Sequence, residues 1–96
     1  MKYNIPGRVV RDLTRFADEH QIEKVILFGS RARGTHTKRS DIDLAVLGGD
    51  VDGFYWDLKE KTHSLLMFDV VDLNHPVSDA LKDEIKKDGV VLYEKV

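Results

Sequence analysis

Two apolar segments separated by a short polar stretch constrain the fold of this 96-residue chain more than any other feature. The first, Val25–Phe28, is a continuous apolar run that stops at Gly29, as expected for a strand covered on both faces. The second, residues 41–47, alternates polar and apolar side chains before becoming fully apolar, which also predicts a strand. The ten residues 31–40 between them are too few for a usual helical crossover, so we expect an antiparallel pair.

The rest of the chain alternates between helical and strand patterns. Apolar side chains at helical spacing predict helices over residues 8–20, 53–64 and 77–88. Further strands are expected over 66–73 and 90–93. Together these elements predict an α/β or α+β fold: one domain, 1–96, with a single mixed sheet of about four strands and helices packed against it. Because so small a core is only marginally stable, a homodimer or hetero-oligomer is a reasonable expectation.

Composition excludes several classes of protein. Hydrophobic residues make up 42% and charged residues 33% of the chain, which is globular composition, and a net charge of -2 argues against general nucleic-acid binding. The absence of cysteine rules out disulfides and thiolate metal sites and fits a reducing compartment. No apolar run approaches membrane-spanning length, and the first residues lack a signal-peptide pattern. We therefore expect a cytoplasmic protein.

Three aspartates are candidates for a metal site. Asp41 and Asp43 share one face of the second strand because alternate residues of a strand point to the same side, and Asp69 begins the apolar part of the third. Neighbouring strands lie about 5 Å apart, so the three carboxylates can converge. Three close anions repel one another unless a cation neutralises them, and carboxylates favour a divalent ion such as Mg²⁺. An Asp-x-Asp pair alone would more often lie on a solvated strand face.

Phosphate-binding features stand directly before this pair. Gly29 and Ser30 follow the first strand, so their backbone amides and hydroxyl can face a phosphate. The basic segment behind them, which we expect to open with a helical turn, adds Arg31, Arg33, Lys38 and Arg39. For any one of these cations a solvated loop is as good an interpretation as phosphate contact, and Arg31 and Arg33 are favoured because they are nearest to Gly29. The four histidines show no paired metal-ligand spacing and are expected at the surface or in turns.

The motifs in combination resemble a known family. Phe28-Gly29-Ser30, followed after ten residues by Asp41-Ile42-Asp43-Leu44, resembles the signature of the nucleotidyltransferases of the DNA polymerase beta superfamily. The stretch 29–34, Gly-Ser-Arg-Ala-Arg-Gly, is similar to the form found in the minimal nucleotidyltransferase (MNT) proteins. Residues 68–73 and 85–93 extend the resemblance over nearly the whole chain. It implies the nucleotidyltransferase fold and transfer of a nucleoside monophosphate, most simply AMP from ATP.

The resemblance also implies roles for individual residues. Gly29 and Ser30 would bind the triphosphate, with Arg31 and Arg33 beside them. Asp41, Asp43 and Asp69 would be the catalytic residues and would hold Mg²⁺, two ions by analogy, with Asp69 as third ligand and base. Asp72 is the competitor for Asp69. It lies three positions further, on the opposite face of an undistorted strand, and a β-bulge would reverse that assignment.

A partner protein is the last implication of the resemblance. MNT proteins sit beside helical HEPN proteins as antitoxin and toxin, and the MNT member transfers AMP to a tyrosine hydroxyl of the HEPN ribonuclease. Two alternatives stay open: a non-catalytic antitoxin that occludes its HEPN partner, and a nucleotidyltransferase acting on a small molecule such as an aminoglycoside. The expected lack of a second helical domain counts against the small-molecule enzyme, because a small ligand needs a second wall to be enclosed.

Overall fold

The computed structural model describes residues 5–35, 37, 40–62 and 66–95. Helices and strands alternate along these residues, as the sequence predicts. In chain order the elements are α1 (Gly7–Glu19), β1 (Lys24–Phe28), α2 (Ser30–Arg33), β2 (Ile42–Leu47), α3 (Val51–Lys61), β3 (Phe68–Asp72), α4 (Asp79–Asp88) and β4 (Val90–Glu94). None of the helices in the described ranges combines the length and apolarity that crossing a membrane requires.

The strands form one mixed sheet with the order β3-β2-β1-β4. The expected antiparallel pairing of β1 with β2 is confirmed, and β1 also pairs antiparallel with β4. On the other side of β2, β3 is parallel, with α3 as the helical crossover that a parallel pair requires. The predicted α+β class and the mixed sheet of four strands are therefore confirmed for the residues that the structure describes.

The starts of α3 and α4 differ from the sequence prediction by two residues because polar side chains cap these helices. The side chain of Asp50 accepts a hydrogen bond from the backbone amide of Gly53 at 3.1 Å, so α3 begins at Val51. In the same way Ser78 accepts from the amide of Leu81 at 3.2 Å, and α4 begins one residue later. The predicted end of the third helix at residue 64 falls outside the described residues, and α3 ends at 61.

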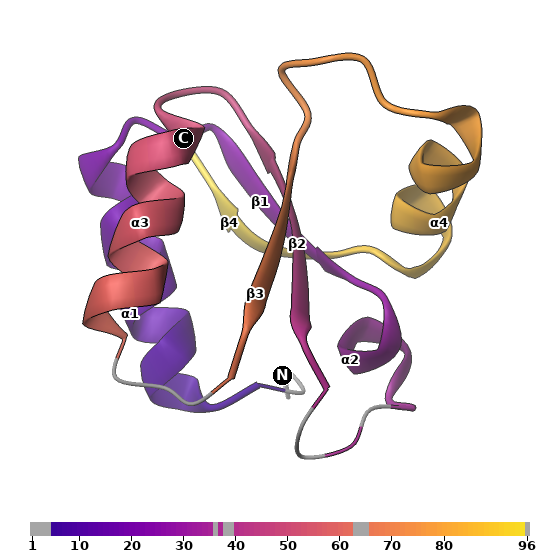
Figure 1. Cartoon of the computed structure of the whole chain (residues 1–96), viewed down its shortest axis with the longest axis horizontal. Coiled ribbons are helices and arrows are strands. Elements are labelled where there is room, and N and C mark those ends of the chain that lie inside the picture. Colours follow the sequence, from indigo (N-terminus) through magenta and orange to yellow (C-terminus); the bar gives the residue numbers. More distant parts are fainter. Residues whose placement is uncertain (1–4, 36, 38–39, 63–65, 96) are drawn as a thin grey trace.

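The two faces of the sheet are covered unequally (Figure 1). Helices α1 and α3 pack side by side on one face and bury the main core with it. In the described part of the chain the other face is covered by α4, with the short helix α2 at its end, and the buried cluster there is small. The fully buried large side chains of the main core include Leu13, Phe16, Leu44, Phe54 and Leu58. Buried residues of the smaller cluster are Phe28, Ala45 and Ile85. Most of the apolar burial that stabilises the chain therefore lies on the α1 and α3 face.

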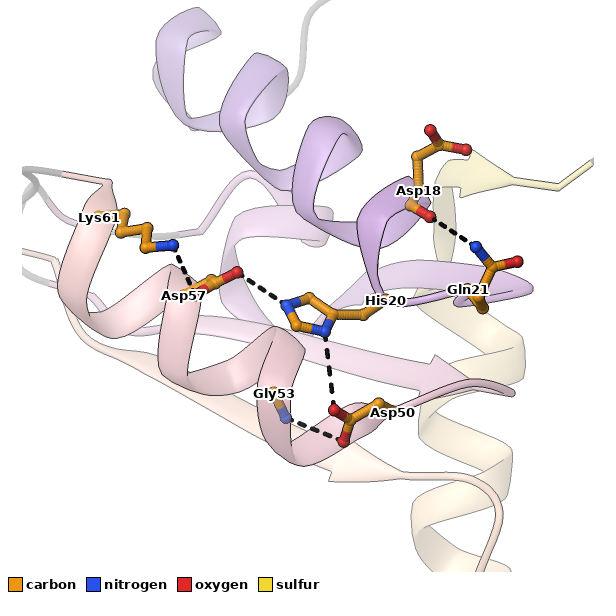
Figure 2. Close-up of polar contacts among 7 residues, drawn as sticks. All are labelled: Asp18, His20, Gln21, Asp50, Gly53, Asp57 and Lys61. Atoms are coloured by element: carbon orange, nitrogen blue, oxygen red, sulfur yellow. Dashed lines mark hydrogen bonds and ion pairs between the residues drawn. The ribbon is translucent and has the colours of Figure 1, made fainter.

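A cluster of charged side chains joins the end of α1 to α3 (Figure 2). The Nε2 atom of His20 lies 2.7 Å from Oδ2 of Asp57, whose other oxygen is 3.2 Å from Nζ of Lys61. An ionised carboxylate only accepts hydrogen bonds, so Nε2 donates. On the other side of the ring, Nδ1 lies 3.7 Å from Oδ2 of Asp50. His20 lies in the turn after α1, as the sequence predicts for a surface or turn histidine, and its partly buried ring also links two helices.

Gly53 leaves the space that this histidine occupies. A Cβ atom on Gly53 would lie 2.8 Å from Cε1 of the His20 ring, which is closer than unbonded carbon atoms approach. Glycine inside a helix costs about 1 kcal/mol relative to alanine. Its presence in α3 is explained by the close approach of the imidazole to the helix backbone.

The cluster makes a pH-dependent contribution to stability. The hydrogen bond from His20 is the main cause that lowers the pKa of Asp57 below its ordinary value of 3.8, and Lys61 adds to it. A lowered pKa means that the stabilisation is complete above about pH 4 and is lost as the pH falls through the folded-state pKa. We expect Asp57→Asn to unfold at lower urea concentration than the unchanged chain at pH 7, with the difference shrinking towards pH 3.

The control for this experiment is Glu60→Gln on the same helix, because Glu60 is exposed. Its urea midpoint should follow that of the unchanged chain at both pH values. Equal losses in Asp57→Asn at pH 7 and pH 3 would contradict the assignment.

Candidate active site

The sheet brings the three predicted carboxylates to one place. Asp43 and Asp69 are direct partners in the parallel register of β2 and β3, and Asp43 also lies opposite Phe28, the last residue of β1. Asp41 stands two residues before Asp43, immediately ahead of β2. Ile42 and Leu44, the residues that alternate with them, are buried in the main core. The aspartates therefore share the opposite face of the sheet, the face that carries α4.

Electrostatic repulsion between these carboxylates acts on Asp43. Burial is the largest cause that raises the pKa of Asp43 above its ordinary value, followed by the negative charges of Asp69 and Asp41. Glu84 of α4 acts in the same direction, and the positive charge of Arg33 opposes them. The group thus has the excess negative charge that a bound cation would neutralise.

Asp72 is separated from this group. The register of β2 and β3 runs without interruption from Ile42 beside Phe68 to Val46 beside Asp72, at the far end of the pair. Its Oδ1 atom accepts a hydrogen bond from the backbone amide of Asn74 at 2.9 Å, which shapes the turn after β3. The geometry therefore favours Asp69 over Asp72 as the third carboxylate, and the catalytic role of Asp69 stays a prediction.

Gly29 connects the predicted phosphate-binding turn to the carboxylates. It has a φ of 75°, and a Cβ atom at this position would collide with the carboxylate of Asp43. Its carbonyl accepts hydrogen bonds from the amides of Ala32 and Arg33, both at 3.1 Å, which closes the single turn of α2 after Ser30. Glycine is the residue that tolerates this backbone conformation and this close approach together.

Arg31 has a structural role that the sequence did not indicate. Its side chain is buried, with a relative exposure of 4%. The guanidinium donates from Nε to the carbonyl of Ser40 at 3.0 Å and from Nη2 to the carbonyl of Thr37 at 3.3 Å. These bonds hold the end of the basic segment immediately before Asp41. The predicted contact of Arg31 with a nucleotide stays a prediction.

The side chain of Arg33 points towards α4 rather than towards the rest of the basic segment 31–40. Its Nη1 atom lies 3.2 Å from Oδ2 of Asp88 and 3.7 Å from Oε1 of Glu84. The same guanidinium carries the positive charge that opposes the rise in the pKa of Asp43. It therefore links α2 with α4 beside the carboxylates. Two of the basic residues predicted to assist phosphate binding, Lys38 and Arg39, lie outside the described residues.

The chemistry of the donor set fits Mg²⁺. Mg²⁺ is usually held by one or two carboxylates together with substrate phosphates and water, rather than by a complete protein cage. Asp41 and Asp43 offer such carboxylates next to the turn at Gly29. Among the described residues, no group of three or more His, Asp or Glu side chains is already arranged as a metal cluster. The fit therefore rests on the crowding of negative charge and not on a preformed cage.

Comparison with known proteins places the chain in a family. A family model described as polymerase beta, nucleotidyltransferase matches residues 12–96. The chain belongs to this nucleotidyltransferase family. Over 82 residues it is 37% identical to a Methanocaldococcus jannaschii protein provisionally named a protein adenylyltransferase, covering 76% of this chain and 80% of that protein. It is 38% identical over 77 residues to the protein adenylyltransferase MntA of Shewanella oneidensis, covering 76% of this chain and 55% of MntA.

Solved structures agree with this placement. One chain of a toxin–antitoxin crystal structure with AMP-PNP superposes with a TM-score of 0.69 and 28% identity, covering 90% of this chain and 73% of that one. Another match comes from a structure of a tri-AMPylated Shewanella oneidensis HEPN toxin in complex with its MNT antitoxin, with a TM-score of 0.61 and 25% identity. That match covers 91% of this chain and 71% of the other. The predicted nucleotidyltransferase fold is confirmed.

Substitution of Gly29 tests its contact with Asp43. We expect Gly29→Ala to lower the free energy of unfolding by about 1–2 kcal/mol or more, because the left-handed backbone conformation is strained for alanine and its Cβ displaces the carboxylate. The control is Gly7→Ala, where a Cβ atom meets open space and the helix should gain up to about 1 kcal/mol. Urea denaturation of both variants measures the difference. Equal stability of the two variants would be inconsistent with the described contact.

The two arginines should differ in their effect on stability. We expect Arg31→Ala to cost about 2–4 kcal/mol, because it removes charged hydrogen bonds and leaves a cavity. Arg33→Ala should cost less than about 1 kcal/mol, because its ion pairs are partly exposed to solvent. Chemical denaturation at pH 7 compares them, and a larger loss in Arg33→Ala would reverse the assignment of the structural arginine.

Proposed function

We propose that this chain transfers AMP from ATP to a tyrosine hydroxyl of a HEPN-domain toxin and so acts as its antitoxin. The observation that carries the proposal is the register pair Asp43 and Asp69, with the backbone of Gly29 directly against Asp43. This arrangement combines carboxylates with a turn suited to phosphate, as phosphoryl transfer requires. Membership of the nucleotidyltransferase family and the names of the relatives support the choice of reaction.

The chain's own residues would position the reactants. The amides at Gly29 and Ser30 would hold the triphosphate of ATP. The tyrosine oxygen then attacks the α-phosphorus, pyrophosphate leaves, and the hydroxyl proton passes to a carboxylate oxygen of Asp69. Mg²⁺, held by Asp41 and Asp43, would stabilise the negative charge that develops on the phosphate oxygens. We expect two such ions, by analogy with the family.

The proposal also includes a cytoplasmic location and a protein as the acceptor. The absence of cysteine from the sequence fits a cytoplasmic protein. A protein acceptor suits the exposed position of Asp69, because it brings its own surface to the site.

Transfer of label from α-labelled ATP tests the reaction. We expect the neighbouring gene to encode a HEPN protein, and we expect that protein to be labelled in the presence of Mg²⁺. In Asp41→Asn and Asp43→Asn the rate should fall about a hundredfold or more, because metal-ion charge stabilisation is worth several kcal/mol. Removal of Mg²⁺ with EDTA should abolish labelling of the unchanged chain.

Asp72→Asn is the matched control, because Asp72 lies on the same strand as Asp69 but at the far end of the pair. It should retain labelling within a few-fold, whereas Asp69→Asn should lose it. Label that persists in both Asp41→Asn and Asp43→Asn would refute the proposed chemistry. If no label appears although the two proteins bind each other and Asp43→Asn still neutralises the toxin, the chain is an occluding antitoxin.

A further inference from the structure

An apolar groove lies on the α4 face of the sheet, the face that also carries the carboxylates. It has a volume of about 360 Å³ and opens between α4 and the strands. Its apolar lining includes Ile26, Leu73, Ile85 and Val91, and Lys82 and Lys86 of α4 stand beside it. Val91, on the edge strand β4, is 44% exposed, which is high for a valine in a sheet. Apolar surface of this kind marks a contact site when it is continuous and bordered by charge.

The groove lies on the same face of the sheet as the proposed catalytic row. The register of the sheet places Val71, Ala45, Ile26 and Val91 side by side across β3, β2, β1 and β4. The neighbouring row in the same face contains Asp69 and Asp43. Two residues along a strand correspond to about 7 Å. Ile26 of the groove therefore lies one row along the sheet and two strands across from Asp69, so a protein that presents a hydroxyl to Asp69 from this face is large enough to contact both.

Incomplete cover explains why the groove exists. The opposite face is buried by two helices, α1 and α3, whereas this face, with the short helix α2 at its end, is covered in the described part of the chain by the ten-residue helix α4. A helix of that length spans about 15 Å. Within the described residues, only Phe28, Ala45 and Ile85 are buried in the cluster under α4. The rest of the apolar row stays accessible to another molecule.

The positive charges beside the groove indicate which kind of molecule binds in it. In the part of the chain that the structure describes, the ammonium groups of Lys82 and Lys86 have no acidic partner within ion-pair distance. A second copy of this chain, docked by a two-fold axis through the groove, would bring these lysines close to their own counterparts. Such like charges repel one another. An acidic partner is favoured instead.

We propose that the groove is the docking surface for the acceptor protein, through a segment that presents an apolar side chain flanked by acidic residues. This proposal rests on the proposed AMP transfer for the identity of the acceptor. The apolar side chain would fill the groove beside Ile26 and Val91, and the acidic residues would pair with Lys82 and Lys86. Docking here would place the acceptor on the face that carries Asp69, where the acceptor would form a wall of the site.

Binding affinity tests the proposal separately from catalysis. We would measure the Kd of the chain for the HEPN protein encoded by the neighbouring gene by calorimetry, without nucleotide. Val91→Asp should weaken binding about tenfold or more, because it buries a charge in an apolar contact. Val91→Ile should bind like the unchanged chain. Since Val91 is exposed on an edge strand, circular dichroism should show that both variants fold.

The lysines supply the second arm of the experiment. The double variant Lys82→Glu with Lys86→Glu should also weaken binding about tenfold and remove most of its salt dependence. Lys87→Glu is the control, because Lys87 lies on the same helix but does not line the groove. Binding should then be unchanged within about twofold.

The outcomes separate the docking proposal from the proposed chemistry. If the unchanged chain binds and labels the HEPN protein but the groove variants bind equally well, the docking surface lies elsewhere and the reaction stands. If the groove variants lose binding but the unchanged chain transfers no AMP, docking stands and the reaction fails. Absence of any binding would overturn the docking proposal. So would sedimentation showing a homodimer that Val91→Asp dissociates, because the occupant would then be a second copy.

Discussion

The pairing of β2 with its two neighbours is the constraint on which the rest of this structure depends. On one side β2 is antiparallel to β1, which sets Asp43 opposite the end of β1 at Phe28. On the other side it is parallel to β3, which sets Asp43 beside Asp69. A shift of either pair by one residue would turn these side chains to the opposite face and into the main core. The burial of Ile42 and Leu44 beneath α1 and α3 makes that shift costly.

Negative charge is concentrated on the α4 face of the sheet, where three aspartates lie together. Burial, and after it the negative charges of Asp69 and Asp41, raise the pKa of Asp43 above its ordinary value. Arg33 relieves part of this repulsion, and it is itself held by Asp88 and Glu84 of α4. The His20 cluster lies on the α1 and α3 side of the sheet and contains its own ion pairs. Among the described residues, Asp41, Asp43 and Asp69 have no such ion pair. Such an imbalance is typical of sites that receive a cation or a polar substrate.

Much of the fold and the position of the carboxylates follow from the sequence because they depend on local periodicity. The strand pattern placed Asp41 and Asp43 on one face, and the short segment 31–40 required an antiparallel pair. The burial of Arg31 could not be read in this way. Its partners are backbone carbonyls six and nine residues away. Because every residue has a backbone carbonyl, residue types do not indicate which carbonyl an arginine will bind.

Long-range contacts were missed for the same reason. His20 meets Asp57 across 37 positions of the chain, and neither residue belongs to a recognisable motif. The contact arises only when α1 and α3 pack on the same face of the sheet. The hydrogen bond from Arg33 to Asp88 spans 55 positions and likewise depends on how α4 packs against the sheet. Sequence periodicity thus predicts which face a residue occupies but not which distant side chain it meets.

Because the two faces of the sheet are covered unequally, selection for folding and selection for recognition act on different residues. Substitutions that decide whether the chain folds fall on the side of α1 and α3, where residues such as Phe16 and Phe54 are fully enclosed. Exposed positions on the thinly covered side, such as Val91, contribute little to that core. The amino acids at these exposed positions can change with little effect on the stability of the core. A scaffold divided in this way can acquire new recognition properties over evolutionary time while its architecture stays constant.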